Sequence, residues 1–552
     1  MSENRRWWRD AVVYQVYLRS FADADGDGIG DLAGLRARLD HIARLGVDAI
    51  WLNPCYPSPQ ADHGYDIADY TGIDPRYGDL GEFDALVMRA RAKGLRVLMN
   101  LVPNHCSAEH PWFKAAAAAP PGSPQRARFH FVDGLGAGGE EPPNNWRSVF
   151  GGPAWSRVTE ADGRPGQWYL HLFDAGQPDF NWTNPEVADY FDQVLRFWFD
   201  RGVDGFRIDV AHGMAKRADL ADWPDGDTYN EHAFNRPEVH AVLRRWRALA
   251  DSYRPARDLA LVGEIWLPDF AELARYIGPD QLGAVFFFDL LLRPWNAATM
   301  RESINLALTT IVPTSTVCAW VLSNHDVHRT ATRYGQPQPD WPGHVADPIE
   351  LARSRAPVDV ALGQARARAA ILLLLALPGS AYLYQGEELG LPEVLDMPDE
   401  ARQDPIWRRS GHTKHGRDGS RVPLPWAAGA PNYGFSLDHK AGRAAAPWLP
   451  QPDWFAGYAV DRQDGDPSST LELYRAALAV RRELWAGGAA PRWDTIDRRD
   501  DVLVLVRGDA RVIVVFGPAQ VELPAGWGEI VVASAPLTGR TLPGNSAAWV
   551  RR

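Results

Sequence analysis

The sequence predicts an α/β protein built on a (β/α)8 TIM barrel, with an inserted subdomain after strand 3 and a C-terminal antiparallel β domain. Three observations predict this architecture. Apolar, strand-like segments alternate with helical patterns eight times along the chain. The stretch 104–177 interrupts this alternation, is rich in Pro, Gly, Asn and Trp, and is too long for an ordinary loop. After residue 487, short alternating strands replace the helical patterns.

The predicted barrel strands are short runs that are apolar along most of their length. Such strands are typical of a parallel sheet buried on both faces. In chain order they are Val12–Tyr17, Ala49–Asn53, Arg96–Val102, Gly205–Val210, Ala260–Ile265, Val285–Leu290, Cys318–Ser323 and Ser380–Tyr384. Eight strands that each feed a helix close naturally into a barrel.

The helices between and after these strands are predicted from apolar residues that recur every three or four positions. They are Ala33–Leu45, Leu80–Lys93, Pro185–Asp200, Pro237–Asp251, Phe270–Ile277, Thr299–Thr309, Leu362–Leu377 and Ser469–Leu484. The resulting divisions are a barrel from residues 1–103 and 178–486, the insertion at 104–177 and the β domain at 487–552. A long segment rich in Trp, Arg and Pro, Pro392 to Asp466, suits a lid over the barrel mouth.

Composition excludes several classes of protein. Of the 552 residues, 45% are hydrophobic and 11% are aromatic, which argues against disorder. The net charge of −12 and the lack of a basic run argue against nucleic-acid binding. The three cysteines form no disulfide or zinc spacing, so a reducing compartment is expected. The longest apolar run, Ala369–Leu377, is too short to span a membrane, and the N-terminus lacks the apolar stretch of a signal peptide. We therefore expect a cytoplasmic protein without membrane or nucleic-acid partners.

Polar residues gather where the predicted strands end, which is where the active sites of such barrels lie. Arg207 and Asp209 share the inward face of the fourth strand, and Glu264 ends the fifth. Neighbouring strands lie about 4.8 Å apart. Two carboxylates there approach the separation of about 5–5.5 Å found in retaining glycosidases, in which one attacks the anomeric carbon and the other protonates the leaving oxygen. Arg207 would keep Asp209 ionised as the nucleophile.

Six motifs extend this pattern: GFRIDV, VGEIW, SNHD, VPNH, HGYDIADY and QPDFNW. In identity and order they resemble the motifs of the α-amylase superfamily of glycoside hydrolases, in its α-glucosidase and oligo-1,6-glucosidase branch. The resemblance covers nearly the whole chain. It implies that Asp209 is the nucleophile, Glu264 the general acid/base and Asp326 a third catalytic carboxylate that binds sugar hydroxyls. It also implies substrate contacts from Asp66, Tyr65, His105, Arg207 and His325.

A loop rich in aspartate and glycine follows the first predicted strand. Asp23, Asp25 and Asp27 alternate there with small residues, which suits a hard cation such as Ca²⁺ or Mg²⁺. The resemblance implies a structural metal held by Asp23, Asp25, Asp27, Asp31 and the Ile29 carbonyl. No cofactor is expected for the chemistry itself.

One residue departs from the family pattern, because Asn100 stands where the first motif usually begins with Asp. The resemblance predicts a retaining, exo-acting α-glucosidase that acts on small α-glucosides, with an α-1,4 preference. An alternative with the same catalytic residues is a transglucosylase or a sugar isomerase of the trehalose synthase or sucrose isomerase type. A remote alternative is a catalytically inactive partner of a membrane transporter.

Overall fold

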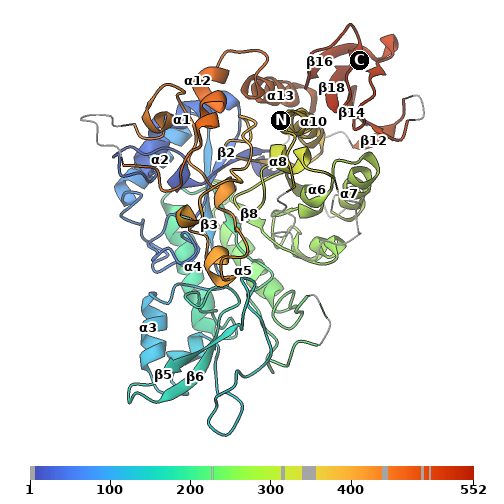
Figure 1. Cartoon of the computed structure of the whole chain (residues 1–552). Helices are drawn as coiled ribbons and strands as arrows, with labels where there is room; N and C mark the ends of the chain where they lie inside the picture. The colour runs from blue at the N-terminus through green and yellow to red at the C-terminus, as the bar shows by residue number, and fades with distance from the viewer. Residues whose placement is uncertain are drawn as a thin grey trace.

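The computed structural model describes residues 6–224, 227, 229–311, 317–338, 356–437, 445–485, 490–496 and 499–552. Its centre is a closed parallel barrel with the strand order β1-β11-β10-β9-β8-β7-β3-β2 (Figure 1). The first strand closes the barrel against the last, with Val12 beside Ala381. The predicted fold class is confirmed.

The barrel strands are fully or almost fully buried, as their apolar sequences require. They are β1 Val12–Val16, β2 Ala49–Leu52, β3 Arg96–Leu101, β7 Gly205–Ile208, β8 Ala260–Gly263, β9 Ala284–Phe286, β10 Val317–Val321 and β11 Ser380–Tyr384. The longer helices around them are α1 Leu32–Leu45, α2 Leu80–Ala92, α4 Pro185–Asp200, α5 Val239–Asp251, α7 Ala297–Thr310, α10 Val360–Ala376 and α13 Thr470–Trp485.

Local sequence fixes where these helices begin and end. Helix α4 starts with Pro185 after the N-cap Asn184, whose side chain accepts a hydrogen bond from the Glu186 amide. Helix α1 starts after the N-cap Asp31 and ends at Gly46, whose φ of 92° is the left-handed conformation that glycine adopts readily.

Two predicted elements differ in the structure. The sixth strand was expected over Val285–Leu290, but β9 ends at Phe286 and residues from Phe288 form the short helix α6, Phe288–Leu292. This segment is apolar throughout, so its composition fits a strand and a buried helix equally well. The segment expected as a helix at Phe270–Ile277 is the 3₁₀ helix η4, Phe270–Tyr276.

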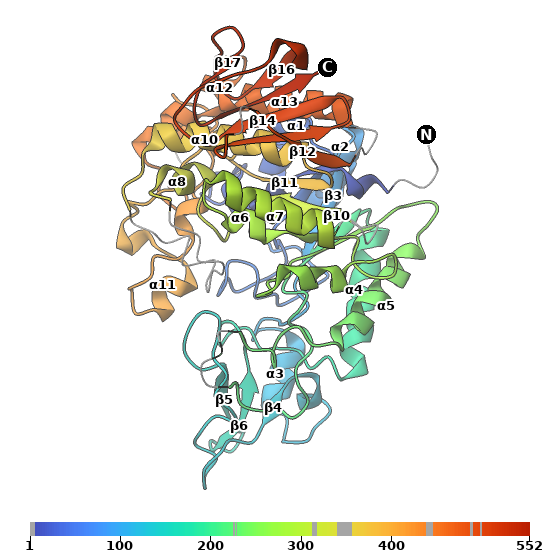
Figure 2. The same ribbon diagram turned by 90° about the vertical axis from the view of Figure 1, so that its right-hand side faces the viewer.

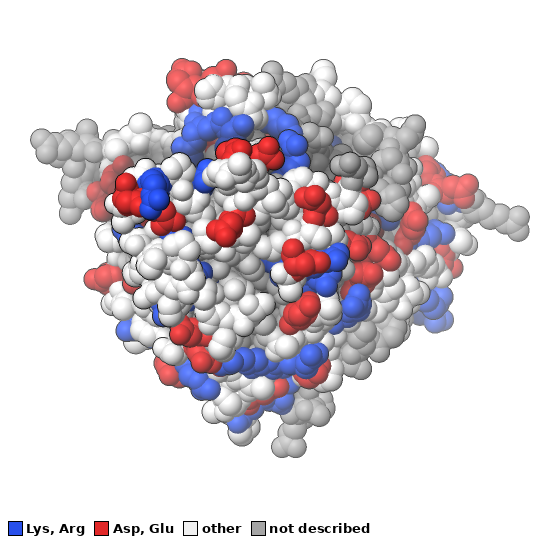
Figure 3. Space-filling model, turned by 90° about the horizontal axis from the view of Figure 1, so that it is seen from below, with Lys and Arg blue, Asp and Glu red and all other residues white. Residues whose placement is uncertain are grey.

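The insertion after β3 contains helix α3 Pro111–Ala118 and a three-stranded sheet of order β4-β6-β5. Its strands are β4 Phe131–Val132, β5 Trp155–Thr159 and β6 Pro165–Leu170. These elements lie at one end of the molecule (Figure 1). On the face seen in Figure 3, acidic and basic side chains are interspersed among uncharged ones.

A C-terminal antiparallel sheet of order β12-β13-β14-β18-β16 lies at the opposite end, over α10 and α13 (Figure 2). Its strands are β12 Pro491–Asp494, β13 Val502–Arg507, β14 Ala510–Val515, β16 Glu529–Ala533 and β18 Ser546–Arg551, and a small ribbon pairs β15 Val521–Glu522 with β17 Thr541–Leu542. The Trp549 indole donates to the Leu372 carbonyl of α10 at 2.9 Å, so this sheet is fastened to the barrel.

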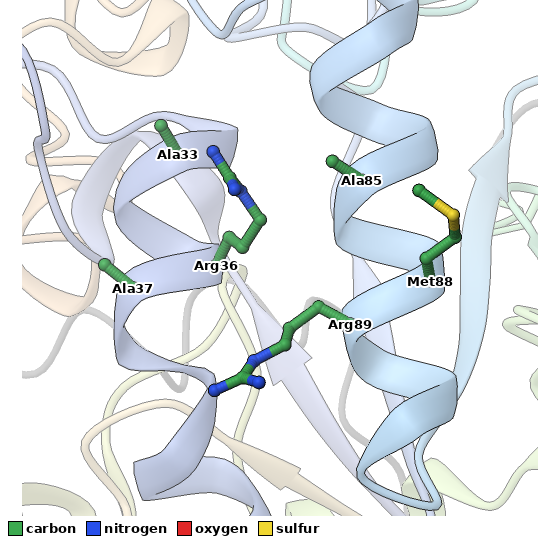
Figure 4. A pocket seen from close by; sticks show the side chains of 6 residues that line it. All are labelled: Ala33, Arg36, Ala37, Ala85, Met88 and Arg89. Atoms are coloured by element: carbon green, nitrogen blue, oxygen red, sulfur yellow. The ribbon is translucent and has the colours of Figure 1, made fainter.

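A surface hollow of about 680 Å³ lies on the outer wall of the barrel. Figure 4 shows that it is a groove between α1 and α2, with Met88 and Arg89 on one side and Arg36 on the other. None of the residues that line it belongs to the polar motifs at the strand ends. No described helix has both the length and the apolar character needed to cross a membrane.

Candidate active site

Arg207 joins the two carboxylates that the sequence places on neighbouring strands. Its Nη1 group donates to Asp209 Oδ1, and its Nη2 group lies 2.8 Å from Glu264 Oε2. All three side chains are buried at the mouth of the barrel. One guanidinium therefore fixes the relative positions of both carboxylates.

The pKa of Asp209 is shifted against the expectation that Arg207 keeps this carboxylate ionised. Burial raises the pKa of Asp209 well above its ordinary value; Arg207 opposes this shift and the neighbouring Glu264 carboxylate adds to it. Two carboxylates share one arginine, so the cation does not offset both the burial and the mutual repulsion.

Glu264 accepts hydrogen bonds on both carboxylate oxygens. Besides Arg207, the Val210 amide donates to Oε2 at 3.0 Å, and the Trp266 indole donates to Oε1 at 3.0 Å. Because each donor comes from a different backbone position, the plane of the Glu264 carboxylate is fixed.

Tyr65 and His325 form a stacked pair beside Arg207. Their ring centroids are 5.4 Å apart with an interplanar angle of 7°, and the Tyr65 hydroxyl lies 2.7 Å from His325 Nε2. The side-chain amide nitrogen of Gln15 lies 2.8 Å from His325 Nδ1. An amide nitrogen only donates, so Nδ1 accepts and Nε2 carries the proton. Burial lowers the pKa of His325 well below its ordinary value, which keeps the ring neutral.

Asp326 faces two arginines from the segment that follows β11. Its Oδ1 lies 3.0 Å from both Arg417 Nη1 and Arg421 Nη2, and its Oδ2 lies 3.2 Å from His325 Nε2. Burial acts to raise the pKa of Asp326, but His325 and the two arginines hold it below its ordinary value. Asp326 is therefore ionised across the neutral range.

Asp62, which directly precedes the HGYDIADY motif, contacts this network, whereas Asp66 within the motif makes local backbone contacts. Both oxygens of Asp66 accept backbone N–H groups, from Ala61 at 2.7 Å and from Asp62 at 3.0 Å. The Asp62 side chain instead lies 2.9 Å from Arg417 Nη2. The Asp66 carboxylate thus orders the loop that carries Asp62, and its contact with the substrate stays a prediction.

Sequence reasoning missed Asp62 and Arg417. Asp62 stands directly before the HGYD motif, so its proximity was the available signal. Arg417 belongs to the long segment predicted as a lid, where no motif marked it. Its guanidinium joins Asp62, Asp326 and Asp404, the last at 2.7 Å from Nε.

His105 lies on the side of the site formed by the insertion. The Gln177 side-chain amide lies 3.2 Å both from His105 Nε2 and from Asp62 Oδ2. Burial lowers the pKa of His105 to about 4, so the ring is neutral. Through Gln177, His105 connects with the network around Arg417.

Asn100 accepts weak contacts in place of an ion pair. Its Oδ1 lies 3.3 Å from both Arg207 Nη1 and Trp51 Nε1, and 3.5 Å from the Tyr65 hydroxyl. A neutral amide thus occupies the position beside Arg207 where the family pattern has a carboxylate.

The Asp-rich loop brings three of its predicted ligands together. Oxygens of Asp23, Asp25 and Asp27 lie within 4.8 Å of one another, and hard cations favour such oxygen donors. Asp31 accepts the Gly34 amide at 2.6 Å and the Ala24 amide at 2.9 Å, and its role as a fourth carboxylate ligand stays a prediction. The Ile29 amide donates to Asp27 at 2.7 Å, which places Ile29 at the loop. The donor set of the three aspartates fits Ca²⁺ or Mg²⁺.

Comparisons with known proteins agree with this geometry. The family model for the catalytic domain of alpha amylase matches residues 15–486. A probable alpha-glucosidase of Rhizobium meliloti (strain 1021) is 38% identical over 507 residues, which cover 87% of this chain and 84% of that protein.

Two solved structures share the whole architecture. The alpha-glucosyl transfer enzyme XgtA is 36% identical, with a TM-score of 0.83 over 99% of this chain and 100% of its own. The isomaltulose synthase PalI from Klebsiella sp. LX3 is 28% identical, with a TM-score of 0.84 over the same shares of the two chains.

Proposed function

Because the chain belongs to the α-amylase family of glycoside hydrolases, we propose that it is a retaining, exo-acting α-glucosidase. Its proposed substrates are maltose and short oligosaccharides, from which it removes a terminal glucose, with α-1,4 bonds preferred. The observation that carries the proposal is the contact of one guanidinium, that of Arg207, with the carboxylates of Asp209 and Glu264. A retaining mechanism needs two protein carboxyl groups that flank the same glycosidic bond at close distance.

In the proposed reaction, Asp209 attacks the anomeric carbon while Glu264 gives a proton to the leaving oxygen. A covalent glucosyl-enzyme intermediate forms and the leaving sugar departs. Glu264 then takes a proton from water, whose oxygen attacks the same carbon and releases glucose with its configuration retained. Arg207 holds both carboxylates in place during the two steps.

The ionised Asp326 and the neutral His325 and His105 are proposed to bind hydroxyls of the same glucose. Exo action is supported by Arg417, which bridges Asp62 and Asp326 through 2.9 and 3.0 Å contacts. We infer that this bridge binds the non-reducing end of the substrate and blocks a longer chain there.

A second candidate is glucosyl transfer or sucrose isomerisation with the same residues. It is favoured by the similarity to the alpha-glucosyl transfer enzyme XgtA and to the isomaltulose synthase PalI. The two candidates differ in whether water or a sugar hydroxyl accepts the glucosyl group.

We also propose a structural role for a cation. Asp23, Asp25 and Asp27 would hold Ca²⁺ or Mg²⁺, which would neutralise their mutual repulsion and brace the loop between β1 and α1. The free thiols of Cys55, Cys106 and Cys318 are all buried, which supports the proposal of a cytoplasmic protein.

The decisive experiment is product analysis. The protein is incubated separately with maltose, isomaltose, sucrose and trehalose, and products are followed by chromatography and proton NMR. We expect maltose to be the best substrate and α-glucose to be the first anomer released. Initial β-glucose would overturn retention, and a tenfold preference for isomaltose in kcat/KM would overturn the proposed linkage. Isomerised sucrose or longer oligosaccharides as main products would establish the second candidate.

A further inference from the structure

Trp266 lies against the carboxylate that is proposed to move the proton. Its indole Nε1 is 3.0 Å from Glu264 Oε1. The indole ring stacks on Phe288, with centroids 4.0 Å apart and an interplanar angle of 9°. Phe288 is buried in the apolar cluster of the barrel interior, so the ring that packs against Trp266 is itself held in place. The indole N–H is therefore held in one direction.

The two oxygens of Glu264 have different donors. Oε2 receives Arg207 Nη2 at 2.8 Å and the Val210 amide at 3.0 Å. Val210 has a φ of 42°, a conformation that β-branched residues rarely adopt, and this backbone places its N–H against Oε2. Oε2 is thus bound by a charged donor and a backbone donor, whereas the donor described at Oε1 is the neutral indole.

We propose that Glu264 Oε1 is the atom that carries the transferred proton, and that Trp266 is the positioning residue that orients this oxygen. The inference rests on the proposed role of Glu264. Protonation at Oε2 would give up a charge-assisted hydrogen bond with Arg207, which is roughly twice as strong as a neutral one. Protonation at Oε1 leaves both contacts of Oε2 intact.

The proton transfer balances in both half-reactions. As the glycosidic C–O bond breaks, its electron pair stays on the leaving oxygen, which takes the proton from Oε1. In the second half-reaction, Oε1 takes a proton from water while the water oxygen bonds to the anomeric carbon. Trp266 donates to Oε1 most strongly when Glu264 is ionised, so it favours the ionised form and fixes the direction of the free lone pair.

Among the described residues, the charged and titratable groups that face the Glu264 carboxylate are Arg207 in β7, Asp209 directly after β7 and Tyr65 in the loop after β2. Trp266 itself is uncharged. A substitution that removes only its N–H therefore leaves these charges as they are.

The test is Trp266→Phe, which keeps an aromatic ring against Phe288 and removes the indole N–H. Its kcat/KM is measured across the pH range for maltose and for 4-nitrophenyl α-glucoside. This quantity reports formation of the glucosyl-enzyme when that step is irreversible. Maltose needs a protonated leaving oxygen, whereas nitrophenolate departs as an anion. A matched control is Trp168→Phe, which removes an indole N–H bonded to the Gly139 carbonyl in the insertion at 3.0 Å.

We expect Trp266→Phe to lower kcat/KM for maltose about tenfold or more, which is part of the roughly 10²–10⁴-fold that general acid catalysis supplies. The value of kcat/KM for the aryl glucoside should change by less than about threefold. The basic limb for maltose should move up by roughly half to one pH unit, because the ionised carboxylate has lost a donor. Trp168→Phe should change neither substrate.

Equal losses on both substrates, or an unmoved basic limb, would overturn the positioning role of Trp266. The retained aryl-glucoside rate shows in the same assay that the variant is folded. Glu264→Gln distinguishes failure of the proposed function from failure of the inference about Trp266. If that variant hydrolyses maltose normally, the proposed function fails, whereas a maltose-inactive Glu264→Gln with an unaffected Trp266→Phe refutes the inference alone.

Discussion

Asn100 Oδ1 accepts a hydrogen bond from Arg207 Nη1 at 3.3 Å, while the buried Nδ2 of Asn100 has no partner among the described residues. The amide binds the guanidinium through one neutral acceptor. Arg207 is therefore left to pair mainly with Asp209 and Glu264. The charge balance of the reacting pair depends on this neutral neighbour.

The isosteric change Asn100→Asp is expected to fold normally and to give an equal or higher kcat. A carboxylate there would compete for Arg207 and leave Asp209 a stronger nucleophile. The acid limb of kcat/KM should move to higher pH. Repulsion between the new carboxylate and Asp209 alone would move this limb in the same direction, so the value of kcat decides between the two explanations. A tenfold lower kcat in a folded variant would establish a required role for Asn100 itself.

Asp209→Asn and Glu264→Gln should each leave a folded protein with little activity on maltose. Loss of the proton donor should cost roughly 10²–10⁴-fold, and loss of the nucleophile at least as much. Steady-state rates and melting curves measure the two effects separately. If either variant keeps more than about a tenth of the wild-type turnover, its assigned role is wrong.

The acid limb of kcat/KM should lie above the ordinary Asp pKa of about 4. Asp209 must be ionised to attack, and burial raises its pKa, so activity is lost as the pH falls through this raised value. A pH profile with an aryl glucoside measures this limb directly. A limb below about pH 4 would contradict the raised pKa of Asp209.

Glu393→Gln should make the protein more stable at pH 8 than the wild type and leave it nearly unchanged at pH 4. Burial raises the pKa of Glu393 to about 7, although the Arg329 amide donates to its Oε2 at 3.0 Å. Below the pKa that the acid has in the unfolded protein, the buried group is protonated in both states and costs the folded state no stability. The folded protein loses stability as the pH rises through the pKa that the acid has in the folded state.

The full difference for Glu393 would be roughly 3 to 4 kcal/mol at most, since its pKa rises from 4.5 to about 7 and each pKa unit corresponds to about 1.4 kcal/mol. Melting temperatures of both proteins between pH 4 and pH 8 measure it. An equal pH dependence in the variant and the wild type would show that Glu393 does not titrate in this range.

Chelation of divalent cations should lower the melting temperature while activity near 25 °C is largely kept. The carboxylates of Asp23, Asp25 and Asp27 lie in the loop before α1, and a cation bound there would stabilise the native state through its binding energy. Asp25→Asn with Asp27→Asn should abolish the effect of the chelator. Immediate, reversible inactivation without unfolding would instead indicate a cation that takes part in the reaction.

The barrel was predictable because its strands are near-continuous apolar runs that alternate with helical patterns. The same signal misled at Val285–Leu290, where an apolar run contains both β9 and the start of α6. Asp209 and Glu264 directly follow β7 and β8, and Asp326 follows β10 after a short loop, so strand direction predicts the edge of the barrel that they occupy.

Loop conformation was the part that the sequence did not reveal. Asp62 stands directly before the HGYDIADY motif and Asp66 lies within it, and only the turn between them decides which carboxylate faces Arg417. Arg417 itself lies 355 positions from Asp62 in the chain, and no periodic pattern links them.

His325 is contacted by the first barrel strand and by the segment beyond the last one. Gln15 lies 2.8 Å from its Nδ1, and Arg421 Nε donates to its carbonyl at 2.8 Å. During synthesis on the ribosome, a nascent chain that ends before Arg417 would already hold Asp209 and Glu264 but would lack the arginines that face Asp326. Hydrolytic activity would therefore appear late in translation, and a single proteolytic cut near Arg417 would silence an enzyme whose barrel stays intact.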